Sequence, residues 1–168
     1  STVRLVFEIE NLESTKNLQL YGGGPWQVWS TARLMSNGVE LDHITMYGRH
    51  HEFFGWLALP IQDAWSEAAV CGMGGSLDET GGLLKDLRPL IGKVGPQLKV
   101  TVLHKLHLSL FNSKKILPCR FMRFDLELTV APTADWLNTG AGFSTNFRLN
   151  NIRCIYDQPT LDEGFSNS

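Results

Sequence analysis

The sequence has few cysteines and no long apolar run, and each of these features excludes a class of protein. The three cysteines, Cys71, Cys119 and Cys154, are odd in number and widely separated. They therefore suggest neither a secreted disulfide framework nor a CxxC metal knuckle, and we expect reduced, buried thiols. No apolar run reaches the roughly 20 residues that a transmembrane helix needs, so we expect no transmembrane segment.

The sequence also lacks a large excess of positive or negative charge. Fifteen Lys and Arg oppose 17 Asp and Glu, which gives a formal net charge of -2. No basic block of the kind that wraps nucleic acid is present, so we expect no direct nucleic acid binding. The modest basic stretch Lys114, Lys115, Arg120 and Arg123 is typical of a solvated loop; the alternative role is contact with acidic partner surfaces.

Motifs for catalysis and cofactor binding are absent. The sequence has no GxSxG, and Gly22-Gly23-Gly24 is not followed by Lys-Ser or Lys-Thr. We expect these glycines to form a turn before a strand, not a phosphate loop before a helix. We therefore expect no catalytic residues, no cofactor and no enzymatic activity.

The histidines are the candidates for a metal site. The densest group of potential ligands is His43, His50, His51 and Glu52. Adjacent residues point about 100° apart on a helix, and no HExxH occurs, so this group is not expected to bind metal. His104 and His107 are three apart in a strand pattern and fall on opposite faces, which predicts one satisfied core histidine and one exposed histidine. The HxH of cupin-like metalloenzymes is absent.

Alternating apolar residues predict β-strands along most of the chain. The strand faces are Val3 to Ile9, Leu98 to Leu110, Phe124 to Val130, and Phe147 to Tyr156. His104 falls on the apolar face of the second of these strands. The last strand changes phase between Leu149 and Ile152, which predicts a bulge at Asn150-Asn151.

A hairpin is predicted at Asn37-Gly38, which separates the runs Trp26 to Ser36 and Val39 to Met46. Both residues tolerate the positive φ that a two-residue type I′ turn requires.

From Arg49 the apolar spacing becomes helical. The apolar positions are Phe53, Phe54, Leu57, Ile61, Trp65, Ala68 and Ala69. They predict one or two short helices broken at Pro60. The seven glycines of Cys71 to Gly95 predict an extended loop, with a helical turn near Leu83 to Leu87.

These elements predict a single domain at residues 1–160, because 168 residues with 43% apolar side chains can fill one core. The fold class is all-β: an antiparallel jelly-roll β-sandwich with a short helical insertion. Six or seven strands are predicted where a jelly roll has eight. We therefore expect a first strand upstream, with residues 161–168 starting a connection. Without that strand, Leu5, Phe7 and Ile9 are expected to remain partly uncovered.

Three blocks resemble a known family. The first contains Pro25-Trp26, Arg33-Leu34, Asn37-Gly38, Asp42, Ile44, Tyr47, Arg49 and Glu52. The second contains Leu110-Phe111, Lys115, Leu117-Pro118 and Arg120, and the third is Leu149 to Ser168. In this order they resemble the first jelly roll of double jelly-roll major capsid proteins of polinton-like viruses, virophages and nucleocytoplasmic large DNA viruses. The departures are His50-His51, Cys119 in place of Leu, and the glycine-rich loop.

The resemblance implies one half of a double jelly-roll subunit in the virion. Three such chains would form a homotrimeric, pseudo-hexameric capsomer of an icosahedral DNA virus shell. Its partners would be its own copies, neighbouring capsomers, and penton and minor capsid proteins. The alternative is a carbohydrate-binding jelly-roll module, in which Trp26, Trp29, Trp56 and Trp65 would stack on sugars; core positions are the other role for these side chains.

Overall fold

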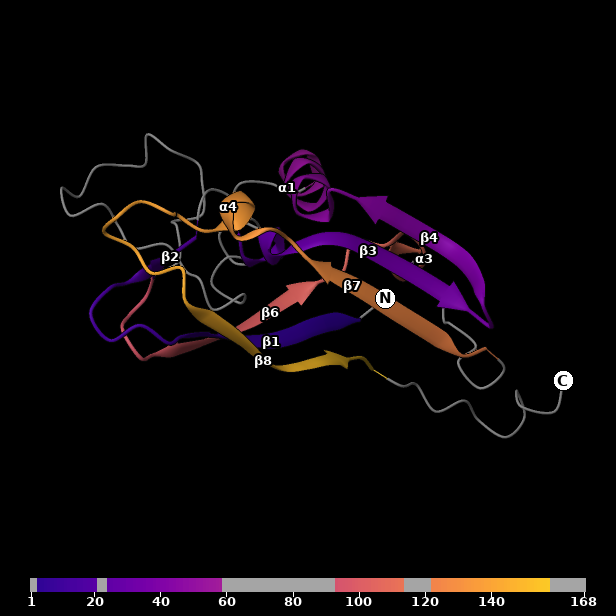
Figure 1. Ribbon diagram of the computed structural model, residues 1–168. Helices are drawn as coiled ribbons and strands as arrows, with labels where there is room; N and C mark the ends of the chain where they lie inside the picture. The colour runs from indigo at the N-terminus through magenta and orange to yellow at the C-terminus, as the bar shows by residue number, and fades with distance from the viewer. Residues whose placement is uncertain (1–2, 21–23, 59–92, 114–121, 158–168) are drawn as a thin grey trace, which may run out of the picture.

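The computed structural model describes residues 3–20, 24–58, 93–113 and 122–157, which form an all-β sandwich (Figure 1). The first layer is a sheet of order β6-β1-β8, and the second is a sheet of order β4-β3-β7. The first contains β1 (Arg4–Asn11), β6 (Lys99–Lys105) and β8 (Phe147–Ile155). The second contains β3 (Trp29–Ser36), β4 (Val39–Thr45) and β7 (Phe124–Val130). Every pairing within these two sheets is antiparallel.

Shorter elements connect the two layers. A two-stranded sheet joins β2 (Leu18–Gln19) to β5 (Lys93–Val94). The helices are the 3-10 helix η1 (Pro25–Val28), α1 (Tyr47–Ala58), α3 (Ser109–Asn112) and α4 (Thr133–Trp136). A strand was predicted directly after Gly24, but the 3-10 helix η1 lies there, with Pro25 in its first turn, and β3 begins only at Trp29.

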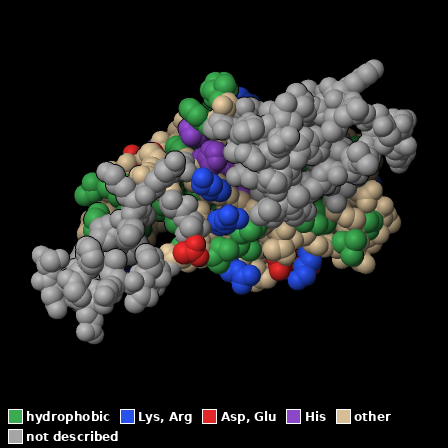
Figure 2. All heavy atoms as spheres, turned by 180° about the vertical axis from the view of Figure 1, so that it is seen from behind, with side chains coloured by type: hydrophobic (Ala, Val, Ile, Leu, Met, Phe, Trp, Pro, Cys, Tyr) green, Lys and Arg blue, Asp and Glu red, His purple; other side chains and the backbone are tan. Residues whose placement is uncertain are grey.

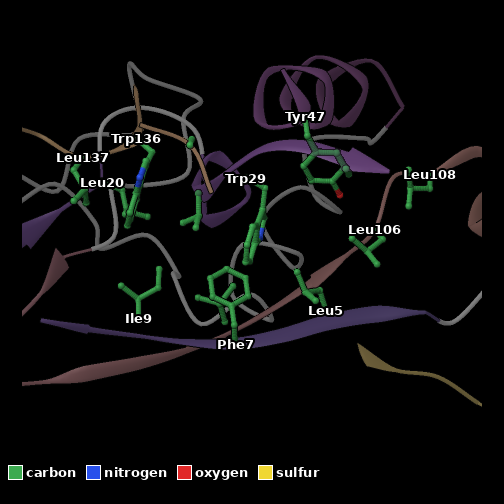
Figure 3. Close-up of a cluster of buried hydrophobic side chains, with 14 of the residues drawn as sticks. Leu5, Phe7, Ile9, Leu20, Trp29, Tyr47, Leu106, Leu108, Trp136 and Leu137 are labelled. Atoms are coloured by element: carbon green, nitrogen blue, oxygen red, sulfur yellow. The ribbon is translucent and has the colours of Figure 1, made fainter. Parts of the chain in front are cut away.

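The core lies between the layers and follows the alternation in the sequence. Leu5, Phe7 and Ile9 point from β1 toward the opposite sheet and are almost fully buried (Figure 3). The ring of Phe7 meets that of Trp29 edge to face, with 5.3 Å between the ring centroids, a favoured geometry for aromatic pairs. The predicted apolar face of the first strand is therefore confirmed.

The expectation that this face remains partly uncovered is wrong. In the chain as described, β1 is the central strand of its sheet and pairs with β6 on one edge and β8 on the other. The second layer covers Leu5, Phe7 and Ile9. Sequence periodicity shows which face of a strand is apolar, but it does not show which strands are its neighbours.

The predicted hairpin is confirmed. Ser36 pairs with Val39, so Asn37 and Gly38 alone form the loop between β3 and β4. Their φ values are 49° and 80°, the positive values that a type I′ turn requires.

The predicted bulge in β8 is present, but it lies at Asn151-Ile152, one residue later than the predicted pair Asn150-Asn151. Val6 pairs with Arg153 and Glu8 with Asn150. Asn151 and Ile152 therefore both lie opposite Phe7, and Asn151 takes a φ of 53°. Two residues opposite one define a β-bulge.

Helix α1 is present where the apolar spacing predicts a helix, but the apolar positions do not form its buried face. Phe53 and Leu57 are 61% and 69% exposed. The helix instead begins at Tyr47 and packs through Tyr47, Gly48 and His51. Gly48 allows this approach, since a Cβ there would lie 2.8 Å from the Gln27 Cα atom of η1. The predicted helical positions from Ile61 onward and the predicted loop up to residue 92 lie outside the described residues.

Two further expectations are wrong. Leu98 was assigned to the buried face of a strand but is exposed, because β6 begins at Lys99, after a turn in which Gln97 has a φ of 54°. Cys154 was expected to be buried, but it is an exposed free thiol on β8. Cys71 and Cys119 lie outside the described residues.

Candidate functional site

One histidine of α1 meets two histidines from the end of β6 and the segment that follows it. We call His51, His104 and His107 the histidine cluster. The ring centroids of His51 and His107 are 4.0 Å apart with the rings stacked, and those of His51 and His104 are 5.4 Å apart. Seen from behind, histidine side chains reach the surface beside hydrophobic side chains and near Lys and Arg side chains (Figure 2).

The convergence of His104 and His107 corrects a prediction. Their spacing predicted opposite faces of one strand, but β6 ends at Lys105. His107 therefore lies beyond the regular strand and is free to stack on His51. The prediction failed because the apolar alternation continues to Leu110 after the strand itself has ended.

Aromatic rings surround the cluster on three sides. Trp26 of η1 stacks on His51 at 4.5 Å between centroids, with 20° between the ring planes. Tyr47 meets His51 and His104 edge to face at 5.9 and 6.1 Å, and Phe7 of β1 meets His104 at 6.1 Å. Sequence reasoning missed Tyr47 as a partner of His51, although their four-residue spacing places them on one helix face.

Hydrogen bonds fix the tautomer of His51. Its Nε2 lies 3.1 Å from the backbone oxygen of Lys105. A carbonyl oxygen only accepts, so Nε2 donates and Nδ1 carries the lone pair. That Nδ1 is buried and has no hydrogen-bond partner among the described residues. The backbone N–H of His107 donates to the Tyr47 hydroxyl oxygen at 3.2 Å, which ties α1 to the chain after β6.

His104 is a buried histidine whose ring nitrogens have no hydrogen-bond partner among the described residues. It is 1% exposed. The prediction of a core position is confirmed, but the prediction of a satisfied side chain is wrong. A buried polar group without a partner is costly, and such groups require an explanation.

Burial keeps the cluster neutral. It lowers the pKa of His104 to about 3 and, with the positive charge of Lys105, lowers the pKa of His107 to about 4. Burial also lowers the pKa of His51 well below its usual value, and the neighbouring histidines add to this effect. For Tyr47, burial raises the pKa, so its hydroxyl remains protonated. The chemistry of this site is therefore that of neutral imidazoles against aromatic rings.

The other candidate metal ligands do not converge. His43 lies on β4, exposed, with its Nδ1 3.8 Å from Glu40 Oε1. The His50 ring packs on Phe54 at 4.5 Å between centroids, and Glu52 Oε2 accepts a 2.7 Å hydrogen bond from Gln27 Nε2. Among the described residues, no group of three or more His, Cys, Asp or Glu side chains has an arrangement that could hold a metal ion.

The tryptophans and the basic residues singled out in the sequence form no common site among the described residues. Trp29 is buried and Trp26 is half-buried against His51, so these two side chains form no open platform for a sugar. Arg123 forms an ion pair with Asp125 at 3.0 Å. Lys114, Lys115, Arg120, Gly22, Gly23, Trp65 and the side chain of Trp56 lie outside what the structure describes.

Exposed apolar side chains on both layers of the sandwich are further candidates for contact surfaces. On β8, Ile152 is 52% and Tyr156, just beyond the strand, 60% exposed. Ile155, Met46, Val39 and Leu41 are also exposed, as are Phe53, Phe54 and Leu57 of α1. Exposed apolar side chains on an edge strand or on a helix face are typical of surfaces that contact another chain.

No family model, curated protein or solved structure matches this chain. Within the described residues, no helix is both long and apolar enough to span a bilayer.

Proposed function

We propose that this chain is a jelly-roll domain of a viral major capsid protein, a structural subunit and not an enzyme. The observation that carries the proposal is the order of the strands in the two sheets. The three blocks of sequence that resemble double jelly-roll capsid proteins support it independently.

The strand order fits six of the eight strands of a jelly roll. With strands named B to I along the chain, a jelly roll has sheets of order B-I-D-G and C-H-E-F. Assigning D, E, F, G, H and I to β1, β3, β4, β6, β7 and β8 gives I-D-G for the first sheet and H-E-F for the second. The described orders β8-β1-β6 and β7-β3-β4 are the same.

The free edges of the two sheets support the same assignment. Strands B and C would then pair with β8 and β7, whose outer edges have no partner among the described strands. Ile152 and Ile155 of β8 and Val130 of β7 are exposed there. Long edge strands with exposed apolar residues are normally covered in natural proteins, so both edges fit the addition of one strand each.

In this proposal the function of the domain is to assemble into a shell. Sandwich domains tolerate long loops at their ends and present sides that pack in symmetric rings. Three chains, each with two jelly rolls, form a pseudo-hexameric capsomer, and neighbouring capsomers, penton and minor capsid proteins contact its outer sides. The exposed apolar face of α1, with Phe53 and Leu57, is suited to one of these contacts.

The test is the oligomeric state of the coding region that includes both flanks of this chain. Analytical ultracentrifugation of the flanked protein should give a trimer, and electron microscopy of negatively stained particles should show pseudo-hexagonal outlines. The 168-residue chain, measured alongside, should give no such trimer. A flanked protein that stays monomeric at micromolar concentrations would contradict the proposal, as would stoichiometric glycan binding by either form.

A further inference from the structure

We propose that the histidine cluster is an acid-responsive latch: below about pH 6, α1 separates from the sandwich and exposes apolar surface. This proposal rests on the cluster alone and does not depend on the capsid assignment.

The cluster holds α1 in place. From α1, His51 stacks between Trp26 of η1 and His107, and its Nε2 donates to the Lys105 carbonyl oxygen. One turn earlier, the Tyr47 hydroxyl accepts the His107 backbone N–H. The opposite face of α1 is exposed at Phe53 and Leu57. Uncharged imidazole rings therefore form one part of the described contacts of the helix, beside the buried Tyr47 ring and the hydrogen bond between Gln27 and Glu52.

The surroundings of the cluster oppose a positive charge. The titratable groups of α1 at this place are Tyr47, His50, His51 and Glu52. Those of β6 and the following segment are His104, Lys105 and His107, while η1 and β1 present Trp26, Gln27 and Phe7, which do not titrate. The charges that act on the three rings within the described residues are those of histidines and Lys105. Glu52, the carboxylate next to His51, is hydrogen-bonded to Gln27.

Proton linkage gives the direction of the effect. In the closed state the cluster histidines have pKa values below the ordinary 6.5, about 3 for His104 and about 4 for His107. In the open state, where water reaches the rings, they regain the ordinary value. The open state therefore binds more protons at any pH between these limits, and the closed state is lost as the pH falls below 6.5. Each histidine contributes up to about tenfold per pH unit to the opening equilibrium, and three contribute up to about a thousandfold.

Hydrogen–deuterium exchange of the whole chain between pH 7.5 and 5.0 tests the latch, after correction for intrinsic exchange rates. Amide protection in α1 should fall by between about tenfold and a thousandfold per pH unit below pH 6.5. Protection in the β3–β4 hairpin, which has no cluster histidine, should change by less than about threefold. Equal losses in α1 and the hairpin would overturn the latch, because they would indicate global unfolding. Protection of α1 that is independent of pH would overturn it as well.

A matched pair of variants separates the cluster from histidine titration in general. His104→Leu keeps a buried side chain of similar size and removes one proton from the equilibrium, so the pH dependence of α1 protection should weaken by about tenfold per pH unit. His43→Gln, at the exposed position on β4, should leave that dependence unchanged. Equal behaviour of the two variants would contradict the proposal.

A measurement on the unmodified chain keeps the test independent of how the variants fold. In NMR spectra, the imidazole signals of the three cluster histidines should stay at neutral-ring positions as long as α1 remains protected. If they titrate near pH 6.5 while α1 is fully protected, the cluster accommodates charge in its closed state and the latch is excluded.

Discussion

At the scale of single residues, the Asn11 side chain forms several hydrogen bonds at one end of the sandwich. It is fully buried at the end of β1. Its Nδ2 donates to the carbonyl oxygens of Lys16, Val94 and Gly95 at 2.8 to 3.1 Å. Its Oδ1 accepts from the Glu13 backbone N–H at 3.1 Å. One amide therefore links β1, the turn that follows it, and β5.

Replacing this side chain should be costly. Asn11→Ala removes the donor and leaves buried carbonyl oxygens without partners, so we expect a loss of about 2 to 3 kcal/mol in the free energy of unfolding. Urea denaturation followed by circular dichroism measures it. Asn150→Ala is the control, because the Asn150 amide bonds the partly exposed Glu10 carboxylate, which water can solvate when the amide is lost, so this variant should lose less stability than Asn11→Ala. Similar losses for both variants would show that Asn11 does not act as a buried junction.

Single residues also show where sequence reasoning stops. The apolar alternation placed His104 in the core, and its burial follows from that pattern. Its unsatisfied nitrogens, and the stacking of His51 on His107, depend on where β6 ends and how α1 lies across it. Tertiary placement of this kind has no local signal, since it is decided by contacts between residues more than 50 positions apart.

At the scale of elements, the β3–β4 hairpin isolates the effect of one backbone angle. Gly38 has a φ of 80°, and a Cβ there would meet no atom within 4 Å. Gly38→Ala therefore adds strain without a clash, and we expect the free energy of unfolding to fall by about 1 kcal/mol. Gly142→Ala is the control, because Gly142 also has open space and lacks a positive φ. Thermal unfolding of both variants measures the difference; an unchanged stability for Gly38→Ala would mean that the turn relaxes to another type.

The elements differ in how much of them the sequence predicts. The hairpin turn, β4, β7 and β8 were predicted within a residue or two because alternation and an Asn-Gly turn are local signals. The buried face of α1 was not, because Phe53 and Leu57 have the spacing of a core stripe but remain exposed. The closeness of Gly48 to Gln27 selects the other face, and the sequence pattern does not contain that contact.

At the scale of the whole molecule, the free edge of β8 is expected to govern self-association. Ile152 and Ile155 are exposed there, and a charge on an exposed edge strand discourages pairing with another chain. The double variant Ile152→Lys, Ile155→Lys should raise the concentration at which the 168-residue chain begins to associate by about tenfold or more. Light scattering over a concentration series measures this.

The single variant Ile152→Lys, which adds one positive charge, has a charge-matched control. Thr101→Lys adds positive charge on β6, at the opposite edge of the same sheet, where Thr101 is exposed. It should leave the association threshold near that of the unmodified chain. If Thr101→Lys acts as strongly as Ile152→Lys, net charge and not the β8 edge controls association.

The arrangement of the strands was only partly predictable. An antiparallel sandwich follows from several alternating segments separated by turns. That β1 lies between β6 and β8 does not follow, because the pairing of Arg4 with both Lys105 and Ile155 joins residues distant in sequence. The expected exposure of β1 was wrong for this reason.

The central position of β1 also determines when the domain can fold during synthesis. Its partners β6 and β8 are translated long after it, and the register joins Arg4 to Ile155. The β3–β4 hairpin depends on local contacts, so it can form on the ribosome soon after it is synthesised. The sheet around Phe7 can form only after β8 has been synthesised. Folding dominated by such distant pairings is slow and leaves apolar strand faces open in the meantime. The nascent chain is thus a stronger candidate for chaperone binding than the finished domain, from the synthesis of β1 until that of β8.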